Sequence, residues 1–167
     1  MLRFVFPTED SRQDVQSFYN EFKSDGGNYI GYGGYKNFDR WLAGMNNRIS
    51  GKNLPAGYVR ENFYLCYDGD DMVGVFNLKF ELTEFLNSGG HIGYAVKPSR
   101  RNRGCASQML KQGLDIAREL GFVRVLCVCD EDNIASERVI IKNGGIFENR
   151  LYDDEEKVFV KRYWIDL

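Results

Sequence analysis

The pattern of apolar and polar residues predicts about seven strands and four helices in a single domain, residues 1–167. Runs in which apolar residues alternate or are continuous indicate strands at 3–6, 62–67, 72–82, 91–96, 122–129, 147–151 and 158–165. Apolar residues at helical spacing indicate helices near 15–22, 38–49, 105–120 and 132–144. A strand, a helix and a strand in succession at 91–129 imply a right-handed parallel pair. The expected fold is α/β, or α+β, with a mixed central sheet flanked by the helices.

The turn between the strand at 91–96 and the helix at 105–120 is the strongest candidate for a binding site. Pro98 cannot continue a strand ladder, and Gly104 has no Cβ, so the backbone can approach a ligand closely. The first N–H groups of the following helix lack intrahelical acceptors, which makes the turn a ready anion site. Four cations fall within seven residues, at Lys97, Arg100, Arg101 and Arg103. On charge alone, a solvated basic loop that caps the strand is an equally good interpretation.

Composition places the chain among ordinary globular proteins, with 43% hydrophobic residues, 28% charged residues and a net charge of −2. No apolar run approaches the roughly 18 residues of a membrane span, and the first ten residues have too short an apolar core for a secretory signal. We therefore expect a soluble cytoplasmic protein without a membrane partner. A pI near 5.5 leaves no broad basic face for nucleic acid. One histidine and four cysteines without framework spacing predict reduced thiols and no metal site.

The order Val96-x-Pro98-x-x-Arg101-x-x-Gly104-x-Ala106 resembles the coenzyme A pyrophosphate loop of the GNAT superfamily of N-acetyltransferases. The order of the predicted elements is similar to the GNAT fold along essentially the full chain. This resemblance implies central parallel strands that splay apart and acetyl-CoA as the cofactor. It also implies that the cofactor contacts the end of the strand and the turn, at Tyr94, Ala95, Val96, Arg101, Asn102, Arg103, Gly104, Cys105 and Ala106.

A second motif, Asn133-x-x-Ser136 followed by Lys142-x-Gly144, resembles the other cofactor-side motif of the superfamily. The resemblance implies that Asn133 hydrogen-bonds the pantetheine arm and that Ser136 lies beside it. The alternative is that Asn133 only caps a helix, a role that asparagine fills without a ligand. More narrowly, the stretches GGHIGYAVKPS, NGG at 143–145 and RYWIDL resemble a little-characterised group of predicted bacterial acetyltransferases, a resemblance that implies no substrate.

One departure from the superfamily concerns the acid that protonates the departing coenzyme A thiolate. Many members carry a tyrosine two positions before the lysine of the second motif, where this chain has Ile140. An isoleucine has no proton to give. We therefore expect Tyr152, Tyr94 or solvent to supply the proton.

A base or a chain of waters must also remove a proton from the attacking amine. His91 has a reference pKa of about 6.5 that suits this task. It lies on the opposite strand face from Tyr94, however, which favours a structural role. Glu81 and Asp130 are weaker candidates, because a carboxylate at the end of a strand is most often solvated.

Three functions follow from these patterns and resemblances. The leading one is an N-acetyltransferase in which a primary amine of a small molecule attacks acetyl-CoA directly; a peptide or protein acceptor is the alternative within that class. A coenzyme A-binding regulator without turnover is the alternative from another class, and the missing tyrosine favours it. The glycine- and tyrosine-rich segment at 25–35 is either a plain connecting loop or a lid over the acceptor. Exposed strand edges are compatible with a homodimer.

Overall fold

The computed structural model describes residues 1–26, 35–154 and 156–167, and in this part of the chain seven strands form one mixed sheet with the order β1-β2-β3-β4-β5-β7-β6. The strands are β1 (Arg3–Val5), β2 (Glu61–Asp68), β3 (Asp71–Lys79), β4 (Ile92–Val96), β5 (Arg124–Asp130), β6 (Ile146–Asp153) and β7 (Val158–Asp166). The helices are α1 (Arg12–Ser24), α2 (Phe38–Ser50), α3 (Cys105–Glu119) and α4 (Ile134–Lys142). This order of elements confirms the prediction, and short 3₁₀ turns are added at Glu9–Ser11, Glu84–Leu86 and Pro98–Arg100. None of the described helices is long and apolar enough to cross a bilayer.

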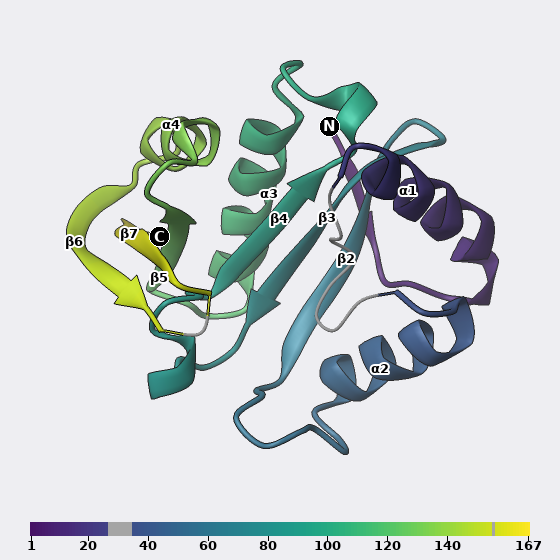
Figure 1. Cartoon of the computed structure of the whole chain (residues 1–167), viewed down its shortest axis with the longest axis horizontal. Helices are drawn as coiled ribbons and strands as arrows, with labels where there is room; N and C mark the ends of the chain where they lie inside the picture. Colours follow the sequence, from purple (N-terminus) through teal and green to yellow (C-terminus); the bar gives the residue numbers. More distant parts are fainter. Residues whose placement is uncertain (27–34, 155) are drawn as a thin grey trace.

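Different helices cover the two faces of the sheet (Figure 1). On one face α1 and α2 bury an aromatic core in which Trp41 meets Phe63 edge to face, with ring centroids 5.9 Å apart. On the other face α3 packs against β3. Gly113 of α3 lies so close to Phe76 that an added Cβ would stand 2.1 Å from the ring carbon Cζ. A glycine inside this helix is therefore explained by its close approach to the sheet.

The two central parallel strands separate toward their carboxyl ends. β4 pairs with β3 as far as Val96, and β5 pairs with β7 as far as Asp130. Between β4 and β5 the register in the described residues consists of one pair, Ile92 with Cys127. Beyond this pair, the facing backbone edges of β4 and β5 do not pair with each other, which confirms the predicted splay.

A backbone and side-chain clamp fixes the point at which these strands begin to separate. The His91 N–H donates to the Leu126 carbonyl oxygen at 2.8 Å, and the Leu126 N–H donates to His91 Nδ1 at 2.9 Å. One residue of the chain therefore satisfies both backbone groups of Leu126 on the side that faces β4.

The strand predicted at 72–82 is too long, and one predicted segment lies mostly outside the described residues. The strand predicted to end at 82 ends at Lys79, because β2 begins opposite it at Glu61 and offers no partner strand beyond that pair. The glycine- and tyrosine-rich segment falls mostly on residues 27–34, which lie outside the described residues, so both of its interpretations stay open. All four cysteines are free thiols.

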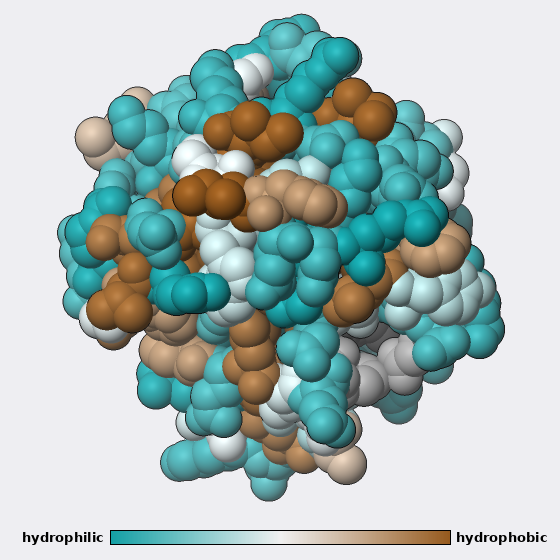
Figure 2. Space-filling model, turned by 90° about the vertical axis from the view of Figure 1, so that its left-hand side faces the viewer, coloured by the Kyte–Doolittle hydropathy of each residue, from teal (hydrophilic) through white to brown (hydrophobic). Residues whose placement is uncertain are grey.

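The strand β6 forms the outer edge of the sheet, beyond β7. Ile146 and Phe147 at its start are 66% and 55% exposed, and Ile141 on the neighbouring α4 is 53% exposed. Figure 2 views the molecule from this side and shows apolar patches among polar side chains. The homodimer that exposed edges allow stays a prediction.

Candidate functional site

The turn after β4 has the backbone geometry of an anion cradle. Gly104 is the residue before α3 and has φ +81°, a left-handed conformation that favours glycine. A Cβ built on it would have no protein atom within 4 Å, so it would point into open space. The first helical hydrogen bond runs from the Gln108 N–H to the Gly104 carbonyl at 3.0 Å, which leaves the N–H groups of Cys105, Ala106 and Ser107 without intrahelical acceptors. The dipole of a 15-residue helix adds to their attraction for an anion.

A cavity of about 610 Å³, here called the α3/α4 cavity, opens in front of this turn. Its walls are the end of β4, the turn, the first residues of α3 and one face of α4. It brings together ten of the predicted cofactor residues: Tyr94, Ala95, Val96, Arg101, Asn102, Gly104, Cys105, Ala106, Asn133 and Ser136. Arg103 does not line it. No pattern in the sequence points to five further lining residues, because their place depends on how α1, α3 and α4 pack: Phe22, Ser107, Ala135, Arg138 and Val139.

Asn133 and Ser136 hold the end of α4 that faces β4. The Asn133 Oδ1 accepts a hydrogen bond from the Ser136 N–H at 3.0 Å, so Asn133 is a helix cap, as one of the two interpretations requires. Its amide nitrogen is still able to donate to a ligand. The Ser136 Oγ lies 2.9 Å from Tyr94 Oη. Burial raises the pKa of the Tyr94 phenol, which therefore keeps its proton at neutral pH.

A second space, here called the β4/β5 hollow, lies on the far side of the splay. It measures about 260 Å³ and shares Tyr94, Asn133 and Ser136 with the α3/α4 cavity. Asp130 also lines it; burial, followed by the charges of nearby carboxylates, raises the pKa of its carboxyl group. Lys79 lines the same hollow, and burial lowers the pKa of its ammonium to about 8. The hollow thus places titratable groups beside the point where the two spaces meet.

The remaining acid and base candidates lie elsewhere. His91 is 9% exposed, packs edge to face against Phe122, and lines neither space. Burial, and then the charges of Lys79 and Arg124, lower its pKa to about 4. Its hydrogen bonds to Leu126 support the structural role.

Tyr152 and Ile140 are also separated from the junction. Tyr152 is 47% exposed on β6 and lines a different hollow of about 300 Å³ together with Glu84 and Asp153. Ile140 is a residue of α4 that is fully buried in the core, and it does not line the α3/α4 cavity. Of the two predicted tyrosines, the structure therefore brings only Tyr94 to the splay.

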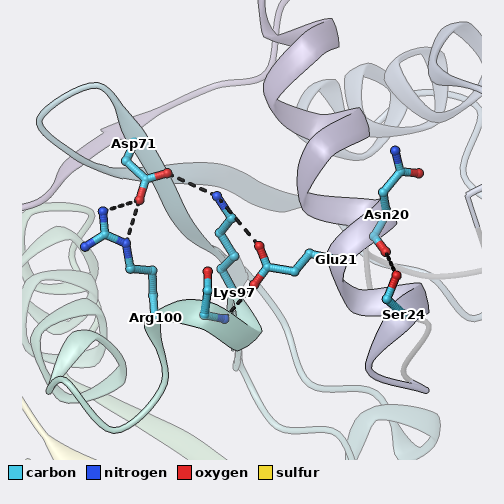
Figure 3. Close-up of polar contacts among 7 residues, drawn as sticks. Asn20, Glu21, Ser24, Asp71, Lys97 and Arg100 are labelled. Atoms are coloured by element: carbon cyan, nitrogen blue, oxygen red, sulfur yellow. Dashed lines mark hydrogen bonds and ion pairs between the residues drawn. The ribbon is translucent and has the colours of Figure 1, made fainter.

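The positive charges of the turn are largely committed to carboxylates from other elements (Figure 3). Asp71, at the start of β3, lies 3.1 Å from Lys97 Nζ and 2.6 Å from Arg100 Nε. Although burial opposes it, the hydrogen bonds from Lys97 and Arg100 lower the pKa of Asp71. Arg101 forms an ion pair with Asp25, at the end of α1, at 2.6 Å. The predicted cluster of cations exists, but three of its four members hold the turn against α1 and β3.

The α1 helix also reaches this turn through its own carboxylate. Glu21 accepts a hydrogen bond from the Ser99 N–H, and its other oxygen lies 3.9 Å from Lys97 Nζ (Figure 3). Phe22 of the same helix lines the α3/α4 cavity and lies 5.4 Å below the Arg101 guanidinium. The position of the turn is thus fixed by residues about 75 positions earlier in the chain.

Sequence comparison identifies a related family. A model of the acetyltransferase (GNAT) domain matches residues 11–146. The ribosomal-protein-serine acetyltransferase of Escherichia coli strain K12 is 30% identical over 100 residues, which are 59% of this chain and 54% of that protein. The chain thus matches only about half the length of this relative.

Solved structures share the fold. A ribosomal L7/L12 alpha-N-protein acetyltransferase in complex with coenzyme A superposes with a TM-score of 0.74 at 18% identity, covering 99% of this chain and 94% of that chain. A mutant spermidine N-acetyltransferase from Vibrio cholerae gives a TM-score of 0.68 at 17% identity, covering 99% and 94%. At such identities the likeness establishes the fold alone, and it confirms the fold class that the sequence predicts.

Proposed function

This chain belongs to the GNAT acetyltransferase family, and we propose that it transfers an acetyl group from acetyl-CoA to the primary amine of a small molecule. The observation that carries the proposal is the junction of two spaces at the splay. Tyr94, Asn133 and Ser136 line both the α3/α4 cavity and the β4/β5 hollow. A thioester held in the cavity and an amine held in the hollow would meet at these residues.

The residues of the α3/α4 cavity fit the parts of acetyl-CoA in order. The free N–H groups of Cys105 and Ala106, beside the side-chain-free Gly104, suit the diphosphate. The backbone edge of β4 at 94–96, which has no partner strand on the β5 side, suits the amides of pantetheine. The Asn133 side-chain amide donates to the same arm. The thioester supplies an activated acetyl group at the splay.

Asp130 and Tyr94 divide the proton transfers. In our proposal Asp130 takes a proton from the incoming ammonium, directly or through water, because its raised pKa brings it closer to that of the amine. The neutral nitrogen attacks the acetyl carbon, so a C–N bond forms and the C–S bond breaks. A backbone N–H near Val96 stabilises the developing oxyanion. Tyr94 Oη donates its proton to the departing sulfur and regains one, through Ser136 or water, from the acylated nitrogen.

The size and charge of the β4/β5 hollow favour a small cationic acceptor. Its volume of about 260 Å³ admits the end of an amine rather than a folded surface. Asp130 lines it, and the charges of Asp132, Glu156 and Asp153 act on that carboxyl group, so the field around Asp130 attracts an ammonium. Lys79 also lines the hollow and opposes this attraction as long as its ammonium, whose pKa burial lowers to about 8, is protonated. A peptide N-terminus is the second candidate, because the hollow shares Ser88 with the space beside Tyr152 and so continues along the surface.

Thiol release from acetyl-CoA with a panel of diamines, amino acid esters and short peptides tests this function. We expect turnover with at least one small amine, and faster turnover with small amines than with peptides. Calorimetry on the same samples measures acetyl-CoA binding independently. Failure to bind at millimolar acetyl-CoA would remove the cofactor. Binding without thiol release for any amine, also after Ile140→Tyr, would favour a non-catalytic coenzyme A-binding regulator.

A further inference from the structure

The arginine of α4 that faces the α3/α4 cavity stands apart from the cations of the turn. Arg138 lines the cavity from the helix opposite the turn, and its side chain is exposed. No carboxylate pairs with it in the described part of the chain. Its neighbour Glu137 instead binds Lys161, at 3.0 Å, and Tyr163. The charge of Arg138 is therefore available to a ligand in the cavity.

The cations of the turn are less available. Lys97 and Arg100 share Asp71, and Arg101 is paired with Asp25 (Figure 3 shows the first pair). Releasing Arg101 to a ligand would leave Asp25 without its partner, and releasing Lys97 or Arg100 would leave Asp71 with one of its two partners. The turn therefore offers an anion chiefly the backbone N–H groups at the start of α3, and these suit a diphosphate.

Coenzyme A carries a second anionic group, the 3′-phosphate of its ribose. If the diphosphate occupies the N-terminus of α3, that site is no longer available to neutralise the 3′-phosphate. A phosphate monoester bears close to two negative charges at neutral pH, and arginine binds it with two parallel hydrogen bonds. We propose that Arg138 binds the 3′-phosphate and makes the protein prefer coenzyme A to dephospho-coenzyme A. This inference rests on the proposed use of acetyl-CoA and adds the residue that reads its 3′-phosphate.

Arg103 is the rival for this role. It is an exposed residue of the turn, directly before Gly104, but it does not line the α3/α4 cavity. The two arginines therefore make opposite predictions about which side of the cavity holds the 3′-phosphate, the turn or α4.

A comparison of two ligands on matched variants tests the proposal. Calorimetry measures the Kd of coenzyme A and of dephospho-coenzyme A for the parent protein, Arg138→Gln and Arg103→Gln. The control is Arg118→Gln, which removes an equal charge from the last turn of α3, outside the cavity. We expect Arg138→Gln to weaken coenzyme A binding about tenfold or more and to change dephospho-coenzyme A binding by less than about twofold. Higher salt should shrink the difference.

Each other outcome argues against the assignment. Equal losses for both ligands would place Arg138 on the diphosphate, and a selective loss in Arg103→Gln would place the 3′-phosphate at the turn. A parent protein that binds both ligands equally has no 3′-phosphate site, although its cofactor assignment would stand. A parent protein that binds neither ligand would refute the cofactor assignment together with this inference. Thermal melting of all variants checks that they are folded.

Discussion

Replacing Gly104 with alanine tests whether the turn after β4 is the phosphate cradle. The added methyl group would project into the open space of the α3/α4 cavity, where no protein atom lies within 4 Å. It would therefore meet the ligand rather than the protein. Gly121, just after the same helix, offers a matched control, since it also has a positive φ, +88°, and open space around its Cβ position, but lies at the far end of α3.

Both substitutions should cost similar stability. A left-handed conformation costs an L-residue about 1–2 kcal/mol, and alanine recovers about 0.4–1 kcal/mol by restricting the unfolded chain. The net loss is about 1 kcal/mol, which lowers the Tm of a chain of this size by about 2–4 °C. Only Gly104→Ala should also affect the ligand. Losing one charge-assisted hydrogen bond from a backbone N–H to phosphate weakens binding by about 1.5–3 kcal/mol, or about 10- to 100-fold.

Calorimetric titration with acetyl-CoA and thermal melting without it separate the two effects. We expect Gly104→Ala to lose affinity and Gly121→Ala to bind like the parent, while both melt a few degrees lower. If Gly104→Ala binds acetyl-CoA within about twofold of the parent, the diphosphate does not approach this turn. Equal losses of affinity in both variants would mean that the orientation of α3, rather than the open space at Gly104, controls binding.

Three further predictions concern Tyr94, Tyr152 and His91. Tyr94→Phe should lower kcat about 100-fold and leave the Kd for acetyl-CoA unchanged. The kcat of Tyr152→Phe should stay within about tenfold of the parent value. If both variants show similarly small effects, water supplies the proton. His91→Gln should change the rate less than about tenfold, because the glutamine oxygen can still accept the Leu126 N–H. The pKa of His91 is about 4 in the folded state and about 6.5 in the unfolded state. Between these pH values the unfolded chain therefore binds more protons than the folded chain. As the pH drops from 6.5 to 4, the free energy of unfolding should fall by up to about 3 kcal/mol. Chemical denaturation across this range should show a shallower fall for His91→Gln, and an identical fall would show that other groups cause it.

Local patterns in the sequence determined the elements and the anion-binding turn. The helical spacing of apolar residues, the proline at 98 and the glycine at 104 act within a few residues of one another, so their effects can be predicted without knowing the rest of the fold. For the same reason the cap formed by Asn133 was predictable, and the structure has it.

Tertiary structure decided which charged and polar side chains are free to act. Asp71 lies 26 positions before Lys97, and Asp25 lies 76 positions before Arg101. No sequence periodicity relates such distant residues. The cluster of cations in the sequence therefore became a set of ion pairs only in the fold. The packing of α4 beside α3 turned Arg138 toward the cavity. The splay of β4 from β5 brought Tyr94 to the junction of the two spaces, while the sheet carried Tyr152 to its outer edge. Local sequence fixes which residues form a helix or a turn, whereas contacts between distant elements fix which side chains a ligand can reach.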